Sequence, residues 1–206
     1  MSLSNKLLFK SIPKLRRLFY CRYNRWMFKR KGIIFAGDAF IYDHIYLRNK
    51  GRILIGDNVI LASGDAVNPL GRNIRTMIFC AKNAYIKIGN NSGISSSSIR
   101  AKEKIEIGEF TMIGSDCIIM DTDAHNLDWR VRSGLTSEKD GESATSSPII
   151  IGNHVLIGTR SIILKGVTIG DRSIIGAGSV VTKSIPADCI AAGNPAKIIR
   201  KLNKKF

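Results

Sequence analysis

The sequence predicts an all-β chain coiled as a parallel β-helix, a solenoid built from six-residue repeats. Isoleucine or valine recurs every six residues without a slip, at Ile151, Ile157, Ile163, Ile169, Ile175 and Val181. Glycine directly follows four of these six residues, and the position four residues after each is mostly small or β-branched. This period matches neither the 3.6 residues of an α-helix nor the two residues of an ordinary strand. The period therefore decides the fold class.

Each hexad of such a repeat supplies one short strand and one corner, and three hexads, about 18 residues, close one triangular coil. The apolar residue points into the prism, where isoleucine and valine suit an extended, half-buried position. The glycine beside it allows the backbone to turn where a Cβ atom would crowd the corner. Successive coils pair at a strand spacing of ~4.8 Å. We therefore expect a prism with an isoleucine-rich interior.

A basic segment precedes the repeats, and residues 1–35 are predicted to form one or two short amphipathic helices, broken near Pro13. Ten lysine and arginine residues precede the first acid, Asp38, in a chain whose formal net charge is +16. Two interpretations of this segment are open: a helical cap on the first coil, and an interfacial anchor on anionic lipid. One helix can serve both roles. No recognised nucleic-acid-binding module accompanies the charge, so nucleic acid is not an expected partner.

The six-residue register recurs upstream in three sets, which begin at Ile55, Ile88 and Ile107. Between the sets the phase slips, at residues 68–87, 95–106 and 120–150. Such slips predict loops that are extruded from a corner of the coil.

The longest interruption, around residues 120–148, is the loop in which we expect chemistry. It contains Asp121, Asp123 and His125 within five residues, and Trp129 follows closely. A neutral imidazole takes a proton near pH 7, and a nearby carboxylate orients the ring and stabilises the imidazolium that forms. Trp129 offers an apolar face to a sugar or to another planar or aliphatic group. Judged from this pattern alone, a histidine in a polar loop is more often a surface residue than a catalytic one.

Three segments, residues 148–159, 175–186 and 191–200, carry a more specific signal. They read PIIIGNHVLIGT, IGAGSVVTKSIP and AAGNPAKIIR. Through them the chain resembles the hexapeptide-repeat acyltransferases, in particular the maltose/galactoside acetyltransferase-like branch that includes O-acetyltransferases of polysaccharide synthesis. The resemblance covers about residues 50–202. It implies that the β-helix is left-handed and that the active site lies between adjacent subunits of a homotrimer.

The resemblance also implies that His125 is the general base, since a loop histidine has this role in the family. It would deprotonate an acceptor hydroxyl, which then attacks the acetyl thioester directly, while backbone N–H groups stabilise the oxyanion. Asp123 or Asp121 would orient the imidazole, and the sequence does not distinguish them. Trp129 is the expected contact to the acceptor, and His154 is expected to be an exposed turn residue.

In the family, coenzyme A lies along the groove between two C-terminal β-helices. The resemblance assigns seven positions to it: Thr159, Ala177, Gly178, Thr182, Lys183, Lys197 and Arg200. Thr159, Ala177 and Gly178 would face the pantetheine and its amides. Thr182 and Lys183 would lie near the nucleotide end. Lys197 and Arg200 match positions that approach the phosphates of the coenzyme. Leu156 departs from the family, because many relatives carry an aromatic residue there.

These inferences predict an acetyl-CoA-dependent O-acetyltransferase that acts on a hydroxyl of a saccharide or glycolipid precursor, with acetyl-CoA as cosubstrate and no metal. One alternative is an acyltransferase for another acceptor, such as an amino sugar, serine or an antibiotic. Another is a non-enzymatic basic scaffold that binds membranes or polyanions. A zinc enzyme of the γ-carbonic anhydrase kind needs a closely spaced pair among three histidines, whereas His44, His125 and His154 are scattered.

The expected organisation is a basic N-terminal segment at residues 1–35, an acyltransferase domain at 36–195 and a basic tail at 196–206. No apolar run approaches the ~20 residues of a membrane span, and the N-terminus lacks the pattern of a signal peptide. The four cysteines are scattered without metal-type spacing, as suits a reducing compartment. We therefore expect a cytoplasmic protein, and peripheral contact with the inner face of the membrane is left open.

Overall fold

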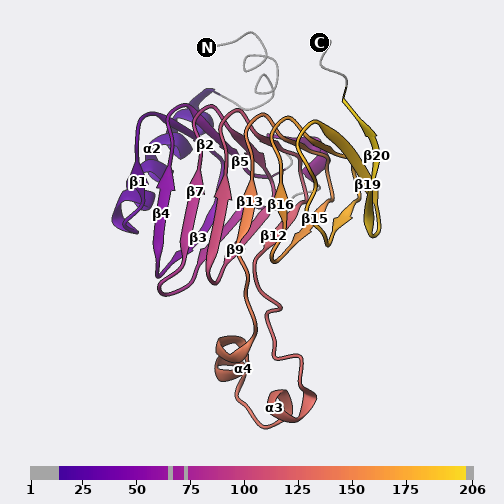
Figure 1. The fold of residues 1–206 in the computed structure, drawn as a ribbon. Coiled ribbons are helices and arrows are strands. Elements are labelled where there is room, and N and C mark those ends of the chain that lie inside the picture. Colours follow the sequence, from indigo (N-terminus) through magenta and orange to yellow (C-terminus); the bar gives the residue numbers. More distant parts are fainter. Residues whose placement is uncertain (1–13, 65–66, 72–73, 203–206) are drawn as a thin grey trace.

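The chain forms a triangular prism of stacked coils, seen in the computed structural model of residues 14–64, 67–71 and 74–202 (Figure 1). Three sheets form its walls, and each coil adds strands to them in turn. Sheet A contains β1 (Ile34–Phe35), β4 (Arg52–Ile55), β7 (Tyr85–Ile88), β10 (Lys104–Ile107), β13 (Ile149–Ile151) and β16 (Thr168–Ile169). Sheet B contains β2 (Ala39–Tyr42), β5 (Val59–Ala62), β8 (Gly93–Ser95), β11 (Met112–Ile113), β14 (Leu156–Ile157), β17 (Ile174–Ile175), β19 (Cys189–Gly193) and β20 (Ala196–Lys201). Sheet C contains β3 (Tyr46–Asn49), β6 (Met77–Cys80), β9 (Ser98–Ala101), β12 (Ile118–Met120), β15 (Ile162–Leu164) and β18 (Val180–Val181).

The strands within each sheet are parallel, apart from β20, which returns antiparallel to β19. The residues of the six-residue period fill the interior, and all six from Ile151 to Val181 are buried in the core. A Cβ atom on Gly158 would lie 2.5 Å from the backbone nitrogen of Ala177 in the next coil, which explains the glycine at this corner. The predicted parallel β-helix is therefore confirmed.

The three predicted loops have different outcomes. The loop at 120–150 is confirmed, since β12 ends at Met120 and β13 begins at Ile149. The slip at 68–87 is a loop only in its first part, which includes the 3-10 helix η1 (Pro69–Gly71), because β6 and β7 follow as regular strands. Residues 65–66 and 72–73 of this segment lie outside the described residues.

The predicted loop at 95–106 is wrong, because β9 and β10 occupy it as regular strands. The buried residues Ile94 and Ile99 stand five positions apart instead of six. The next corner is two residues longer, because Ile99 and Ile107 stand eight positions apart whereas the equivalent Ile163 and Ile169 stand six apart. The two changes together shift the phase by one residue and leave the coil intact.

Helix α2 (Lys14–Arg30) closes the N-terminal end of the prism. Phe28 of this helix is fully buried and belongs to the same core as the coil residues. The buried Asn24 side chain donates hydrogen bonds to the backbone carbonyls of Ile41 (3.2 Å) and Asp43 (2.6 Å) in the first coil. The helix therefore acts as a cap. Pro13, where a break was predicted, lies outside the described residues.

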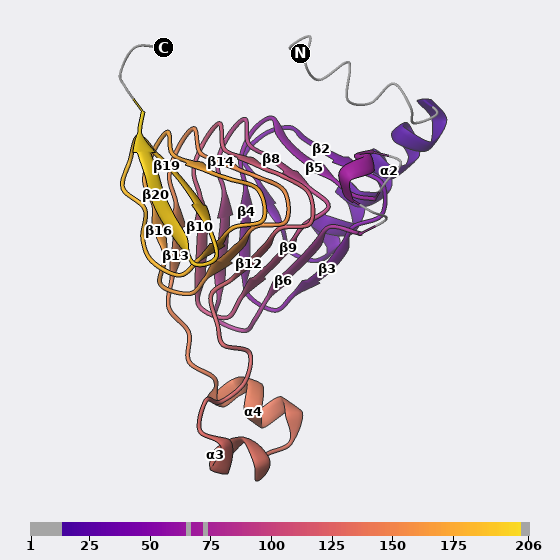
Figure 2. The same ribbon diagram turned by 90° about the vertical axis from the view of Figure 1, so that its right-hand side faces the viewer.

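The C-terminal segment stays with the solenoid beyond the end of the six-residue period. Ile185 forms a bridge with Ile169 of sheet A, and β19 pairs with β17. The segment predicted as a basic tail begins as β20, whose residues as far as Lys201 form a hairpin with β19. Figure 2 shows this hairpin at the end of the prism opposite α2.

Candidate active site

A long loop projects from the corner of the prism between sheets C and A, with two short helices at its tip (Figures 1 and 2). Helix α3 (Trp129–Ser133) is capped by Asp128, and helix α4 (Ser137–Ser143) is capped by Thr136. An antiparallel bridge between Thr122 and Ser146 joins the two arms of the loop at its neck. The loop is therefore ordered, and the bridge holds its two arms together where they leave the prism.

His125 lies in this loop with its imidazole against a carboxylate of α4. Its Nδ1 atom is 2.6 Å from Oδ2 of Asp140, whose side chain is only 6% exposed, whereas the His125 side chain is 64% exposed. The backbone N–H of Asn126 donates to the other oxygen of Asp140 at 2.8 Å. This N–H group, followed by the His125 ring, holds the pKa of Asp140 below its usual range. Asp140 is thus a carboxylate at neutral pH and accepts a hydrogen bond from Nδ1–H of His125.

The expectation that Asp123 or Asp121 orients His125 is wrong, because both carboxylates are engaged elsewhere. Asp121 is buried and accepts the backbone N–H groups of Lys102, Glu103 and Lys104 at 2.7, 2.8 and 2.7 Å. It therefore organises a corner of the coil.

Asp123 belongs to the neck of the loop. Its Oδ2 accepts hydrogen bonds from the Lys165 ammonium (2.5 Å) and the Thr145 hydroxyl (2.6 Å), and these donors lower its pKa. Asp123 thereby ties the outgoing arm of the loop to the returning arm and to the next coil.

Lys102, which the sequence did not single out, joins the solenoid to α4. Its ammonium donates to the backbone carbonyls of Gly141 (3.0 Å), Glu142 (2.6 Å) and Ala144 at the end of the helix. A cation at a helix C-terminus satisfies unpaired carbonyls and is favoured by the helix dipole. Since α4 carries Asp140, Lys102 positions the carboxylate that holds His125.

The residues assigned to the coenzyme fall at two corners of the prism. Thr159, Ala177 and Gly178 lie between sheets B and C in successive coils, where the Gly178 N–H donates to the Thr159 carbonyl at 2.8 Å. Gly178 has φ of +71° and open space around it. Thr182 and Lys183 follow β18 at the corner between sheets C and A. Within one chain the structure does not bring the two groups together.

Lys197 and Arg200 lie on β20 at the C-terminal end of the prism, and both are exposed. Trp129, the expected acceptor contact, is the first residue of α3 and is 63% exposed, with the Arg130 guanidinium 5.5 Å from its ring centroid. His154 is an exposed turn residue, as expected, and stacks on Phe110 at a centroid distance of 4.9 Å.

Among the residues that the structure describes, no three His, Cys, Asp or Glu side chains form a group that could hold a metal ion. The same residues contain no helix that is long and apolar enough to cross a membrane.

Comparison with known proteins decides the family. The chain is 34% identical over 161 residues to WbbJ of Escherichia coli K12, named as a candidate lipopolysaccharide biosynthesis O-acetyl transferase, and the match covers 77% of this chain and 76% of that protein. The chain belongs to the hexapeptide-repeat acetyltransferases. A family model described as a hexapeptide repeat of succinyl-transferase matches residues 148–183.

Two solved structures of this family extend over nearly the whole chain. A galactoside acetyltransferase in complex with coenzyme A is 25% identical, covers 98% of this chain and 81% of its own, and superposes with a TM-score of 0.56. A hexapeptide-repeat acetyltransferase from Vibrio cholerae, in complex with acetyl coenzyme A, is 23% identical, with coverages of 99% and 92% and a TM-score of 0.61. The family fold, a left-handed β-helix, is thus the fold of this chain.

Proposed function

We propose that this acetyltransferase transfers an acetyl group from acetyl-CoA to a hydroxyl group of a saccharide or glycolipid precursor. The observation that carries the proposal is the His125–Asp140 pair, an exposed imidazole oriented by a buried carboxylate, on a hexapeptide-repeat acetyltransferase scaffold. The names of two relatives, one of lipopolysaccharide biosynthesis and one acting on galactosides, support a saccharide as the acceptor.

In this proposal His125 is the general base. Because Asp140 accepts the hydrogen of Nδ1, the Nε2 atom of the neutral ring carries a lone pair. Nε2 takes the proton of the acceptor hydroxyl as its oxygen attacks the carbonyl carbon of the acetyl thioester. His125 then returns this proton to the sulfur as the C–S bond breaks. Asp140 stabilises the imidazolium between the two steps.

The residues assigned to the coenzyme fit its chemistry. Lys183, Lys197 and Arg200 are exposed cations that make no ion pair within the described part of the chain, so they are available to phosphate groups. The open corner at Gly178 leaves room for a slender chain such as pantetheine. Bound there, acetyl-CoA would supply the acetyl group as an activated thioester.

We further propose that the active enzyme is a homotrimer with the site between subunits. His125 and the Gly178 corner lie at different corners of the prism, so a neighbouring chain is needed to bring the base beside the thioester. The outer face of sheet B also exposes the large apolar side chains of Met112 and Leu156. Apolar surface of this kind is typical of subunit interfaces.

Acetyl transfer assays test the proposed function. Release of free coenzyme A thiol from acetyl-CoA should depend on a saccharide with a free hydroxyl and should yield an alkali-labile ester. An amide product with an amino sugar would assign the enzyme to the alternative acceptors, and so would acetyl transfer to serine. A chain that binds no coenzyme A and yet binds vesicles would instead be the non-enzymatic scaffold.

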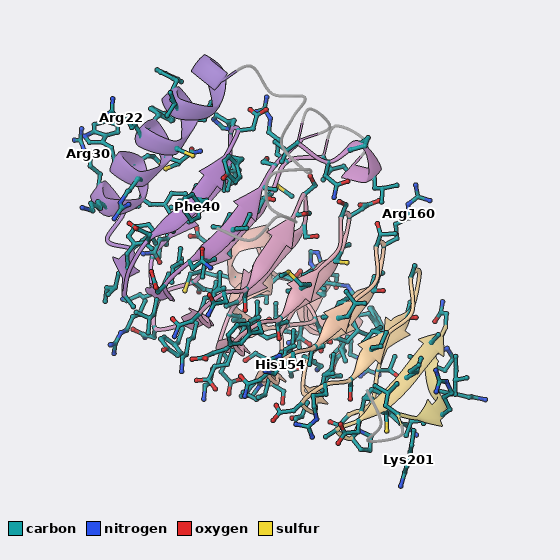
Figure 3. All side chains as sticks on the ribbon, turned by 90° about the horizontal axis from the view of Figure 1, so that it is seen from above. Arg22, Arg30, Phe40, His154, Arg160 and Lys201 are labelled. Atoms are coloured by element: carbon teal, nitrogen blue, oxygen red, sulfur yellow. The ribbon has the colours of Figure 1, made fainter. Side chains whose placement is uncertain are left out.

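We also propose, on the basis of α2, that the enzyme is cytoplasmic and makes peripheral contact with the anionic inner face of the membrane. The outer side of this helix exposes Leu18, Phe19 and Trp26, at 62, 63 and 52%. Arg22 and Arg30 point away from the coils on the same helix (Figure 3). Aromatic side chains interleaved with arginines suit the headgroup region of anionic lipid, where each basic residue contributes ~1 kcal/mol.

Replacing the exposed aromatics tests this contact without removing the cap. The double variant Phe19→Ser/Trp26→Ser should bind phosphatidylglycerol-containing vesicles about a hundredfold more weakly, because burying each aromatic side chain contributes at least about 1.5 kcal/mol. Trp129→Ser, at the other exposed tryptophan, is the matched control and should bind like wild type. Cosedimentation measures both. Equal binding of all three proteins would contradict the contact.

A further inference from the structure

A row of three side chains on the outer face of sheet C forms a stacked cluster. Arg48 on β3, Phe79 on β6 and Arg100 on β9 occupy the same register position of neighbouring strands. The guanidinium carbon of each arginine lies 5.4 Å from the centroid of the Phe79 ring. Since β3 and β9 flank β6, the phenyl ring is held between two cations. We call these three residues the arginine ladder.

The charges of the arginine ladder are not neutralised within the described part of the chain, where neither guanidinium makes an ion pair or a side-chain hydrogen bond. Arg172 of the solenoid differs in this respect, because an acid neutralises it. Arg172 binds both carboxylate oxygens of Asp188, at 2.6 and 2.8 Å. A guanidinium that stacks on an aromatic face keeps the N–H donors at its edge free for an anion.

The ladder lies beside the base of the catalytic loop. Arg100 pairs in register with Met120, the last residue of β12 before the loop, and Lys102 holds α4 two positions further along the chain. The corner next to the ladder adds the exposed cations Lys50 and Lys82. One exposed acid, Glu103, is also at this corner, and it accepts a hydrogen bond from the Ser146 hydroxyl at 2.9 Å. The surface that leads to the loop is therefore positively charged.

The ladder is separate from the residues assigned to the coenzyme. In sheet C the strands β3, β6 and β9 lie at one end and β18 at the other, and Lys183 directly follows β18. Lys197 and Arg200 lie on β20 at that same far end. Phosphates bound there leave the ladder free for another anion.

We propose that the arginine ladder is an acceptor subsite for a saccharide that carries carboxylate or phosphate groups. This inference rests on the proposed acetyl transfer and names the class of acceptor. Arginine binds both groups through paired N–H donors. The two guanidinium groups stand two strand spacings apart, about 9.6 Å. This separation suits an extended acceptor with more than one negative charge better than a single small anion.

The test compares anionic and neutral probes on a matched pair of variants. Trigalacturonate carries carboxylates, UDP-galactose carries phosphates, and galactotriose is neutral. We expect wild type to bind at least one anionic probe about tenfold more tightly than galactotriose, as charge-assisted hydrogen bonds allow. Arg48→Gln/Arg100→Gln should lose this preference. Calorimetry at low salt gives the dissociation constants, and the two anionic probes distinguish carboxylate from phosphate.

Arg52→Gln is the control, because Arg52 also stacks on an aromatic ring, that of Tyr85 at 5.8 Å, but on sheet A. It should keep the preference, and acetyl-CoA affinity should be unchanged in every variant. The proposal is overturned if wild type shows no preference, if Arg52→Gln loses it equally, or if acetyl-CoA affinity falls in parallel. If wild type binds the anionic probe through the ladder but transfers no acetyl group, the subsite stands and the proposed function fails.

Discussion

His125→Asn is expected to lower kcat by about 10²–10⁴, the usual contribution of a positioned general base. Asparagine can still donate a hydrogen bond to Asp140, so the arm of the loop should keep its fold. It has no lone pair that can take the proton of the acceptor hydroxyl at neutral pH. Steady-state release of coenzyme A thiol measures the loss, and calorimetry should show unchanged affinity for coenzyme A.

His154→Asn is the matched control for this variant. His154 has φ of +56°, a left-handed conformation that asparagine tolerates, and it lies in a turn where it stacks on Phe110. Its replacement should leave kcat within about threefold of wild type, as expected for a surface substitution. Full activity of His125→Asn, or an equal loss in His154→Asn, would show that His125 is not the base.

Asp140→Asn should lower kcat by about 100-fold or more through the tautomer of His125. The backbone N–H of Asn126 needs an acceptor at this position, so the amide oxygen of the new side chain should face it. Its NH₂ group would then donate to Nδ1 of His125. The neutral ring must in that case carry its proton on Nε2, where it cannot act as a base.

Asp128→Asn is the matched control in the same loop. Asp128 caps α3 by accepting the N–H of Arg130 at 2.9 Å, and asparagine is an equally good cap. It should therefore retain activity and loop structure. The two variants are compared by kcat and by the NMR shifts of the His125 ring nitrogens, which report the tautomer directly. Unchanged ring-nitrogen shifts with wild-type kcat in Asp140→Asn would contradict the assigned role.

The carboxylate that orients His125 was harder to predict than His125 itself. His125 could be selected because it stands in a polar break between two regular stretches of the repeat. Asp140 could not, because it follows fifteen residues later in a polar helix with nothing to distinguish it from Glu138 or Glu142. Proximity in sequence favoured Asp121 and Asp123, but their carboxylates are taken by backbone N–H groups and by Lys165.

The coils were predicted well where every corner has the same length. The stretch from Ile151 to Val181 keeps a six-residue phase, and each of the six apolar residues at this spacing is buried. At residues 95–106 one corner is a residue shorter and the next is two residues longer, and the resulting shift of phase was misread as a loop. The pattern also did not show that the chain continues in the prism through β19, because Ile185 and Cys189 do not keep the period.

The sequence by itself determined the β-helix and the place where it is interrupted. Both depend on local spacing, since an inward isoleucine and a corner glycine are each recognised from their immediate neighbours. Only the tertiary structure decided which carboxylate holds His125, which lysine anchors α4, and that Arg48, Phe79 and Arg100 form one ladder. These contacts join different coils or the two arms of one loop. Their geometry follows from strand register and loop folding, which the spacing of apolar residues does not encode.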